Sequence, residues 1–316
     1  MVSLKDVKQR KLPDFIIPGA AKGGTTSAYY YLDQHPEIQM SRLKEPFYFA
    51  YAGEEAINFS SGDNPEIITS LADYLELFPA TDTAVARGES STWYLYLHKK
   101  TIENIKSIYA GQPLPKIIIF LRNPVARCWS HYRMNVDNGW EDLPFEQAIS
   151  KDIIKERLKN NYAPTYDYIG FGRYYQQVKA YLDNFDQVKI VLFEDFKAAP
   201  EKTMQELFQF IGVNDYFLPD TSVRFNVSGP PKNRALNYIL FGDHFIKRLF
   251  RPVVDKLNSI QLVDNMMLRI RANNSREISP DDQLLQKLRD TYQKNIHKLE
   301  KKLTMDLGQW YTPGQD

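Results

Sequence analysis

The sequence predicts an α/β protein in which helices cover both faces of a central parallel sheet. Short apolar runs typical of buried strands alternate with longer segments of helical periodicity, an order typical of βαβ units. The strongest run, Lys116–Leu121, ends in five consecutive apolar residues, as central parallel strands do. The chain has 316 residues, of which 43% are hydrophobic, and shows no internal repeat. We therefore expect a single domain with a helical C-terminal part.

The expected elements follow from these patterns in chain order. Apolar runs predict strands at residues 14–18, 37–40, 84–88, 116–121 and 188–193. Helical spacing, with proline or glycine at several helix ends, predicts helices at residues 25–33, 70–78, 98–108, 124–136, 143–158, 173–185, 200–211 and 281–303. Composition predicts loops at residues 53–68 and 213–234, and helix-like apolar segments alternating with basic residues at 235–271. The expected boundaries are a polar tail over residues 1–12 and one domain over residues 13–312.

Charge and cysteine content exclude several classes of protein. The 40 basic and 39 acidic residues nearly cancel, so neither a broadly basic surface nor a nucleic-acid partner is expected. Cys128 is the one cysteine, which excludes an internal disulfide and favours a reducing compartment, the cytoplasm. The charged first residues lack a signal-peptide pattern, and no run of about 18 apolar residues predicts a membrane span. The histidines lack metal-site spacing, so no catalytic metal is expected.

A glycine-rich segment, residues 19–27, follows the first predicted strand and leads into the first predicted helix. A strand, a glycine turn and a helix N-terminus together form a cradle for phosphate groups. Gly19 and Gly24 have the spacing of a nucleotide-binding P-loop, but Thr25 stands at the usual lysine position and Lys22 lies inside the turn. A plain structural turn is the alternative interpretation of this pattern.

Arg122 follows the strongest predicted strand at a position where a nucleotide triphosphatase needs an aspartate for Mg²⁺. A cation at this point favours a doubly anionic ligand that side chains neutralise without magnesium. Ser130 lies eight residues further on, in the second turn of the next predicted helix, so the two residues are placed to clamp a further phosphate. The alternative is a surface arginine and an ordinary helix serine. We expect Arg127 and Arg133 to be solvated helix residues.

With these motifs in place, the chain resembles the sulfotransferases that use 3′-phosphoadenosine 5′-phosphosulfate (PAPS). Residues 22–27 resemble the 5′-phosphosulfate loop of that family, and residues 121–132 resemble its 3′-phosphate site. Residues 44–49, 88–91 and 305–310 are similar to segments of its heparan-type and bacterial branches. The resemblance covers about residues 13–311 and is specific for the donor, and much less so for the acceptor.

The resemblance implies a role for each matching residue. Lys22 is expected to contact the 5′-phosphosulfate and to stabilise charge on the bridging oxygen. The backbone and hydroxyl donors to the same group are expected to come from Gly23, Gly24, Thr25, Thr26 and Ser27. Arg122 and Ser130 are expected to bind the 3′-phosphate. Glu45 matches the glutamate that acts as general base in the heparan-type branch.

Two other residues compete with Glu45 for the role of base. Glu89 stands at the end of a predicted strand, as a base or as a residue that orients the acceptor. His131 is a third candidate because histidine is the commonest general base, although we expect it mainly to pack within its helix. A structural pair with Lys44 is the alternative interpretation of Glu45.

Two later segments have less specific patterns. The basic loop at residues 224–234 is similar in place to a flap that closes over the donor, with Ser228, Lys232 and Arg234 as candidate contacts, or is a solvated loop. Residues 236–270 mix aromatic and basic residues, which suits a lid within a helical acceptor-side segment over 235–280. A surface that touches a membrane or carrier protein, or a helical pair packed on the domain, fits the same pattern.

The expected reaction is in-line transfer of the sulfuryl group from PAPS to a hydroxyl, with a carboxylate base and no metal. The expected acceptor is a small or lipid-like alcohol or an acyl chain on a carrier protein, with a saccharide as the alternative. Fold analogy alone does not choose between them. A magnesium-dependent P-loop kinase or nucleotidase and a non-catalytic nucleotide-binding module are two further hypotheses.

Overall fold

The computed structural model describes residues 12–55, 57–79, 81, 83–222 and 280–311. Within these ranges a five-stranded sheet has the order β2-β3-β1-β4-β5, and every pair of neighbouring strands is parallel. The strands are β1 (Phe15–Gly19), β2 (Ile38–Met40), β3 (Ala86–Ser90), β4 (Lys116–Leu121) and β5 (Val188–Leu192). Because all strands are parallel, their carboxyl ends meet at one edge of the sheet, where ligands bind in such folds.

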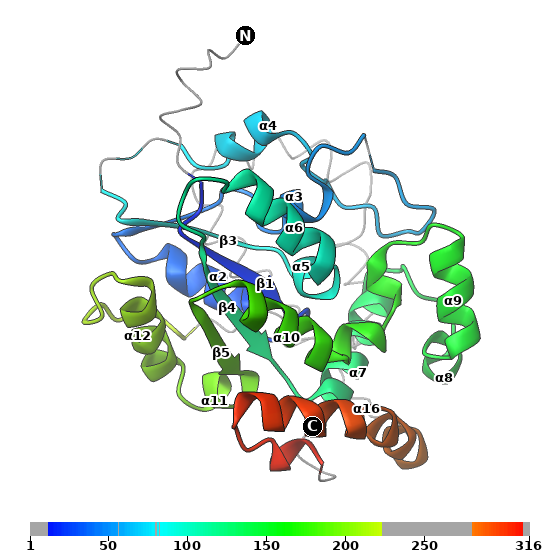
Figure 1. Cartoon of the computed structure of the whole chain (residues 1–316). Helices are drawn as coiled ribbons and strands as arrows, with labels where there is room; N and C mark the ends of the chain where they lie inside the picture. Colours follow the sequence, from blue (N-terminus) through cyan, green and yellow to red (C-terminus); the bar gives the residue numbers. More distant parts are fainter. Residues whose placement is uncertain (1–11, 56, 80, 82, 223–279, 312–316) are drawn as a thin grey trace.

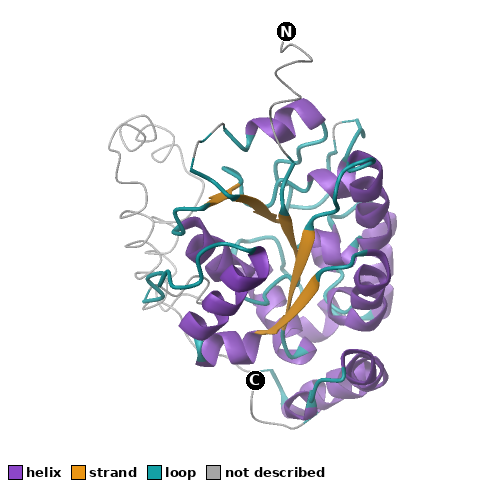
Figure 2. Cartoon of the chain, turned by 60° about the vertical axis from the view of Figure 1, so that its left-hand side comes forward, coloured by secondary structure: helices purple, strands orange, loops and turns teal. Residues whose placement is uncertain are grey.

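Helices lie on both sides of the sheet (Figures 1 and 2). The α-helices are α2 (Thr25–Asp33), α3 (Tyr48–Tyr51), α4 (Leu71–Glu76), α5 (Trp93–Tyr96), α6 (His98–Ile108), α7 (Pro124–Asp137), α8 (Phe145–Ala148), α9 (Lys151–Lys159), α10 (Tyr174–Asn184), α11 (Phe193–Ala198), α12 (Pro200–Ile211) and α16 (Asp282–Leu303). The 3₁₀ helices are η1 (Pro164–Tyr166), η2 (Gly170–Gly172) and η3 (Gly308–Trp310). Among the described helices, none has the length and apolar character that a bilayer span needs.

The core consists of two apolar clusters, one on each face of the sheet. One cluster joins alternate strand residues to α2, α11 and α12, with Leu32 and Phe208 fully buried. The larger cluster joins the other strand face to α5, α6, α7, α10 and α16, with Val125 and Tyr292 among its fully buried members. Since each β4 side chain from Ile117 onward is fully buried, the sheet is covered on both sides, as the unbroken apolar run predicts.

Several predicted elements have the same bounds in the structure. The helices predicted at 25–33, 98–108 and 200–211 are α2, α6 and α12, and the strand predicted at 116–121 is β4. Gly212 ends α12 with φ 93°, a left-handed conformation that glycine adopts without steric cost. The prediction of an α/β fold with helices on both faces is confirmed.

Other predictions need correction. The single helix predicted at 143–158 is two helices, α8 and α9, because the Ser150 hydroxyl accepts the Ile153 N–H at 3.4 Å and starts a new helix. Arg127 is fully buried instead of solvated. The strand predicted at 84–88 is β3, which extends to Ser90 and so includes Glu89. The predicted tail and the segments at 224–234 and 235–280 lie almost wholly outside the described residues.

Candidate active site

The turn between β1 and α2 leaves space for an anion. The chain passes twice through the left-handed region, at Lys22 with φ 66° and at Gly24 with φ 96°. A Cβ atom on Gly23 would lie 3.0 Å from the Ala20 carbonyl oxygen and 3.1 Å from that of Phe120, so only glycine fits without a backbone shift. In the described part of the chain no side chain caps the N-terminus of α2. Its free N–H groups and positive dipole end therefore face this turn.

A cavity of about 380 Å³ lies beside the turn. Its walls are Ala21, Lys22, Gly24, Thr25, Thr26, Leu43, Lys44, Glu45, Phe47, Asp63, Pro65, Glu66, Thr92, Trp93, His131, Met134, Trp140 and Thr165. Six of the residues that the sequence predicts for the site are therefore brought together around one cavity. The others with described positions, which are Gly23, Ser27, Glu89, Arg122 and Ser130, are not part of its walls. Ser228, Lys232 and Arg234 lie outside the described residues.

Arg122, the first residue after β4, adjoins the Lys22 turn. Its Nη1 donates to the Lys22 carbonyl oxygen at 3.3 Å, and its guanidinium lies 4.6 Å from the centre of the Phe193 ring. The Tyr174 hydroxyl donates to the Arg122 carbonyl oxygen at 3.0 Å and fixes the backbone there. Ser130 is half-buried on α7. The ends of two adjacent strands, β1 and β4, thus carry a cationic side chain each.

Glu45 follows β2 in the chain but is fixed to the end of β3. Its N–H donates to the Ser90 carbonyl oxygen at 3.0 Å. Its Oε2 accepts hydrogen bonds from the Thr92 N–H at 3.2 Å and the Thr92 hydroxyl at 2.8 Å. Its Oε1 lies 2.5 Å from the Lys44 Nζ. The ion pair with Lys44 is therefore present, and the same carboxylate also lines the cavity.

Glu89 is fully buried beneath the cavity wall. Its Oε1 accepts hydrogen bonds from the Tyr74 hydroxyl at 2.9 Å and the Tyr94 hydroxyl at 3.0 Å, and its Oε2 accepts one from Ser91 at 3.1 Å. Burial raises the pKa of this carboxyl to about 7, and the charge of Glu45 acts in the same direction. All its contacts are thus with the packed interior, and none is with the cavity.

His131 lines the cavity between two hydrogen-bonded partners. The Arg127 Nη1 donates to its Nδ1 at 3.0 Å, because a guanidinium has donors only, and Arg127 Nη2 donates to the Tyr168 carbonyl oxygen. Burial, followed by the positive charges of Arg127 and Lys22, holds the His131 pKa well below its ordinary value. The neutral ring then carries its proton on Nε2 and donates to the Thr165 Oγ1 at 2.6 Å. The Thr165 hydroxyl, which lines the cavity, accepts this bond and keeps its own proton to donate.

Asp63, Trp93, Trp140 and Thr165 line the cavity but are absent from the sequence prediction. Asp63 lies in the segment predicted as a loop at 53–68, Trp140 lies between α7 and α8, and Trp93 and Thr165 lie in the short helices α5 and η1. No local pattern marks them, since tertiary contacts alone bring these segments together.

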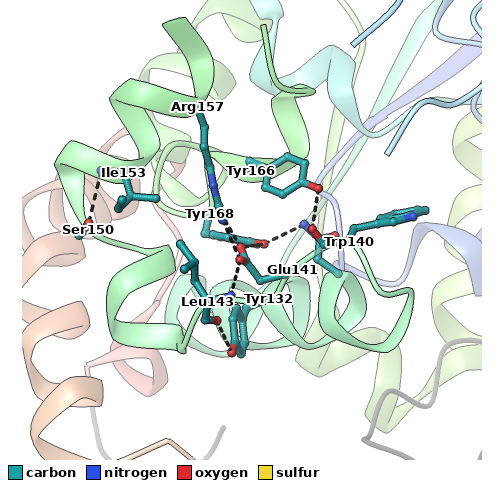
Figure 3. Close-up of polar contacts among 10 residues, drawn as sticks. Tyr132, Trp140, Glu141, Leu143, Ser150, Ile153, Arg157, Tyr166 and Tyr168 are labelled. Atoms are coloured by element: carbon teal, nitrogen blue, oxygen red, sulfur yellow. Dashed lines mark hydrogen bonds and ion pairs between the residues drawn. The ribbon is translucent and has the colours of Figure 1, made fainter. Parts of the chain in front are cut away.

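A buried ion pair holds the wall that carries Trp140 (Figure 3). Arg157 Nη1 lies 2.5 Å from Glu141 Oε2, and its Nη2 donates to Oε1 at 2.8 Å. The Tyr168 hydroxyl donates to the same carboxylate at 2.9 Å, and the Tyr166 hydroxyl donates to the Trp140 carbonyl oxygen at 2.8 Å. Burial opposes ionisation of Glu141, but the hydrogen bonds, led by those from Arg157, hold its pKa below the ordinary value. The wall is therefore held rigidly on α9 and η1.

Within the described ranges, no group of three or more His, Cys, Asp and Glu side chains is arranged to hold a metal ion. The parallel sheet and the glycine turn between β1 and α2 place the chain in the P-loop α/β class. A sequence model of the sulfotransferase family matches residues 13–217, and the chain therefore belongs to the sulfotransferase family. The family resemblance seen in the sequence is confirmed.

Individual relatives agree with this assignment. The crystal structure of a sulfotransferase from Alicyclobacillus acidocaldarius superposes with a TM-score of 0.71 at 29% identity, covering 96% of this chain and 100% of that one. Carbohydrate sulfotransferase 15 of Mus musculus is 24% identical over 255 residues, which cover 66% of this chain and 45% of that protein. The membrane-associated sulfotransferase kil1 of Dictyostelium discoideum is 21% identical over 325 residues, covering 78% of this chain and 65% of that protein. This chain thus spans less than half the length of the carbohydrate sulfotransferase.

Proposed function

We propose that this enzyme transfers the sulfuryl group of PAPS to a hydroxyl of a small acceptor, with Lys22 on the donor side and Glu45 as general base. The observation that carries the proposal is that both side chains line one cavity of about 380 Å³, within the range of small-molecule sites. PAPS, when bound, supplies an electrophilic sulfur with a good leaving group, 3′-phosphoadenosine 5′-phosphate (PAP).

The residues on the donor side fit a bisphosphorylated nucleotide. The uncapped N-terminus of α2 and the Lys22 turn suit the 5′-phosphosulfate, because both offer positive charge and N–H donors. Arg122 adjoins the turn at the end of the neighbouring strand, which suits a second phosphate on the same ligand. Ser130 is the proposed hydroxyl partner of Arg122.

The contacts around the cavity favour Glu45 among the three candidate bases. Glu89 has both carboxylate oxygens occupied by hydroxyl donors of the interior and does not line the cavity. His131 has its Nδ1 occupied by Arg127 and its Nε2 proton directed at Thr165, so neither nitrogen is ready to accept a proton. Glu45 lines the cavity, and an ionised carboxylate keeps further acceptor capacity on each oxygen.

The proposed chemistry needs three actions from these residues. Glu45 takes the proton of the acceptor hydroxyl as the acceptor oxygen bonds to sulfur. Lys22 neutralises the electron pair that stays on the bridging oxygen when the sulfur–oxygen bond breaks. Thr165 lines the cavity and donates its hydroxyl proton to an oxygen of the transferring group. Positioning and charge stabilisation supply most of the rate, as they do in phosphoryl transfer.

A binding and transfer experiment tests the proposal. Thermal unfolding is measured with PAP, ADP, and ATP plus Mg²⁺, and transfer is measured with radiolabelled PAPS and a set of hydroxylated acceptors. We expect stabilisation by PAP in the presence of EDTA, and labelled product from at least one acceptor. If ATP with Mg²⁺ stabilises the protein and PAP does not, the proposal is refuted in favour of a kinase or nucleotidase. Tight PAP binding without transfer to any acceptor would favour a non-catalytic module.

A further inference from the structure

Asp63 is a buried carboxylate in the cavity wall that the proposed chemistry does not use. The residue is 7% exposed and lines the same cavity as Lys22 and Glu45. Among the described residues, no hydrogen bond or ion pair reaches its carboxylate. Burial raises its pKa to about 7, with a further contribution from the negative charge of Glu45. Because the residue lines the cavity and its carboxylate has no partner in the described part of the chain, this carboxylate is available to a ligand in the cavity.

The loop around Asp63 is held firmly in place. The Ser60 N–H donates to the Asn161 carbonyl oxygen at 2.9 Å, and the Ala163 N–H donates to the Ser61 hydroxyl oxygen at 3.1 Å. The Ser61 hydroxyl donates in turn to the Asp63 carbonyl oxygen at 3.1 Å. The carboxylate is therefore not the end of a loosely attached loop, and its position in the wall is set by the neighbouring backbone.

The same loop packs against the Trp140 wall. A Cβ atom on Gly62 would lie 3.2 Å from Trp140 Cδ1, so glycine allows the close approach. The Tyr166 hydroxyl holds the Trp140 carbonyl oxygen, and the ion pair with Arg157 holds the next residue, Glu141 (Figure 3). The acidic and aromatic parts of the wall thus form one rigid surface.

The charges of this surface are the opposite of those on the donor side. Three carboxylates line the cavity, on Glu45, Asp63 and Glu66, and no arginine is among the described lining residues. Of the two lining lysines, Lys44 lies 2.5 Å from Glu45, and Lys22 belongs to the donor turn. An acceptor with its own negative charge would meet like charges here, with Asp63 adding its charge at pH values above its pKa of about 7, and this disfavours binding.

Flat apolar rings complete the surface. Phe47 and Trp93 stack with ring centres 4.3 Å apart, and both line the cavity together with Trp140. Aromatic rings with a few well-placed hydrogen-bonding groups suit a ligand that has an apolar C–H face and several hydroxyls.

We propose that Asp63 is an acceptor-binding residue that hydrogen-bonds a second hydroxyl next to the reacting one, so that the cavity takes uncharged polyhydroxylated acceptors and rejects anionic ones. This inference rests on the proposed sulfuryl transfer. It assigns the acceptor class by charge and hydrogen bonding: polyols or neutral sugars, with or without an alkyl chain.

The test uses matched pairs of acceptors that differ in one carboxylate. Octyl β-glucoside, octyl β-glucuronide and a panel of uncharged polyols with their carboxylated counterparts are incubated with the full chain and radiolabelled PAPS. We expect kcat/KM for the neutral member of a pair to exceed that for the anionic member at least 100-fold. At pH 8, where Asp63 is ionised, this ratio should fall at least tenfold in Asp63→Asn, while PAP affinity stays unchanged. Asp73→Asn, an exposed change of the same kind on α4, is the control and should keep the wild-type ratio.

A merely structural role of Asp63 would not change the ratio between paired acceptors. Equal use of neutral and anionic acceptors by the wild type, or an unchanged ratio in Asp63→Asn, would overturn the inference. PAP binding without product from any uncharged acceptor would overturn it too and leave the donor assignment intact. Absence of PAP binding would instead refute the proposed function on which the inference rests.

Discussion

Replacing the buried Glu89 by glutamine should remove a pH-dependent loss of stability. The pKa of this carboxyl rises from 4.5 to about 7, mainly because burial disfavours its ionised form. At ~1.4 kcal/mol for each pKa unit, ionising Glu89 in the folded protein costs about 3 kcal/mol more than in the unfolded chain. Because the folded state keeps its proton while the unfolded state ionises, this cost builds up as the pH rises from about 4.5 to about 7.

Glutamine can keep the contacts of Glu89 without its charge. Its carbonyl oxygen can accept from the Tyr74 and Tyr94 hydroxyls, which donate to one oxygen of the glutamate, and its amide can donate to Ser91. The unfolding free energy of Glu89→Gln minus that of the wild type should therefore increase with pH. Since the unfolded glutamate is already partly ionised at pH 5, the expected increase between pH 5 and pH 8 is about 2.5 kcal/mol.

Urea denaturation at pH 5, 6, 7 and 8 measures this difference. Glu103→Gln on α6, where the glutamate is exposed, is the matched control and should follow the wild type at every pH. A constant difference between Glu89→Gln and the wild type across this range would refute the reasoning. It would show that Glu89 is already ionised in the folded protein at pH 5.

Further substitutions test the proposed roles in transfer. Glu45→Gln should lower kcat by roughly 10²–10⁴, the usual contribution of a general base, with PAP affinity unchanged in calorimetry; normal turnover would remove Glu45 from this role. Lys22→Ala should lower kcat by roughly 10²–10³ while PAP affinity changes far less, because the lysine acts on charge that develops as sulfur leaves. Equal losses in turnover and PAP affinity would show that Lys22 only holds the nucleotide.

The sheet and the turn that carries Lys22 could be predicted because they depend on local patterns. The apolar run of β4 and the glycines around Lys22 dictate a buried strand and a tight turn by themselves. Parallel strands end at one edge of a sheet, so a residue that follows β4 is expected beside the turn that follows β1. The hydrogen bond from Arg122 to the Lys22 carbonyl oxygen agrees with this expectation.

The cavity wall that carries Asp63 and Trp140 could not be predicted in this way. Asp63 and Trp140 are separated by more than 70 positions in the sequence and meet through loop contacts that have no periodic signal. Arg127 looks like a solvated helix residue because sequence alone does not show that Tyr168 supplies a buried carbonyl oxygen for it. The boundary between α8 and α9 depends on one serine cap, which apolar spacing does not reveal.

Calorimetric titration of PAP into the wild type and Arg122→Ala, in EDTA, tests the central claim most directly. We propose that the Lys22 turn and Arg122 bind the two phosphate-bearing ends of one nucleotide without a divalent ion. The wild type should then bind PAP tightly, and Arg122→Ala should lose about 1.5–3 kcal/mol of binding free energy, the range for a hydrogen bond to a charged group. Equal affinity in the two proteins, or binding that requires Mg²⁺, would contradict it.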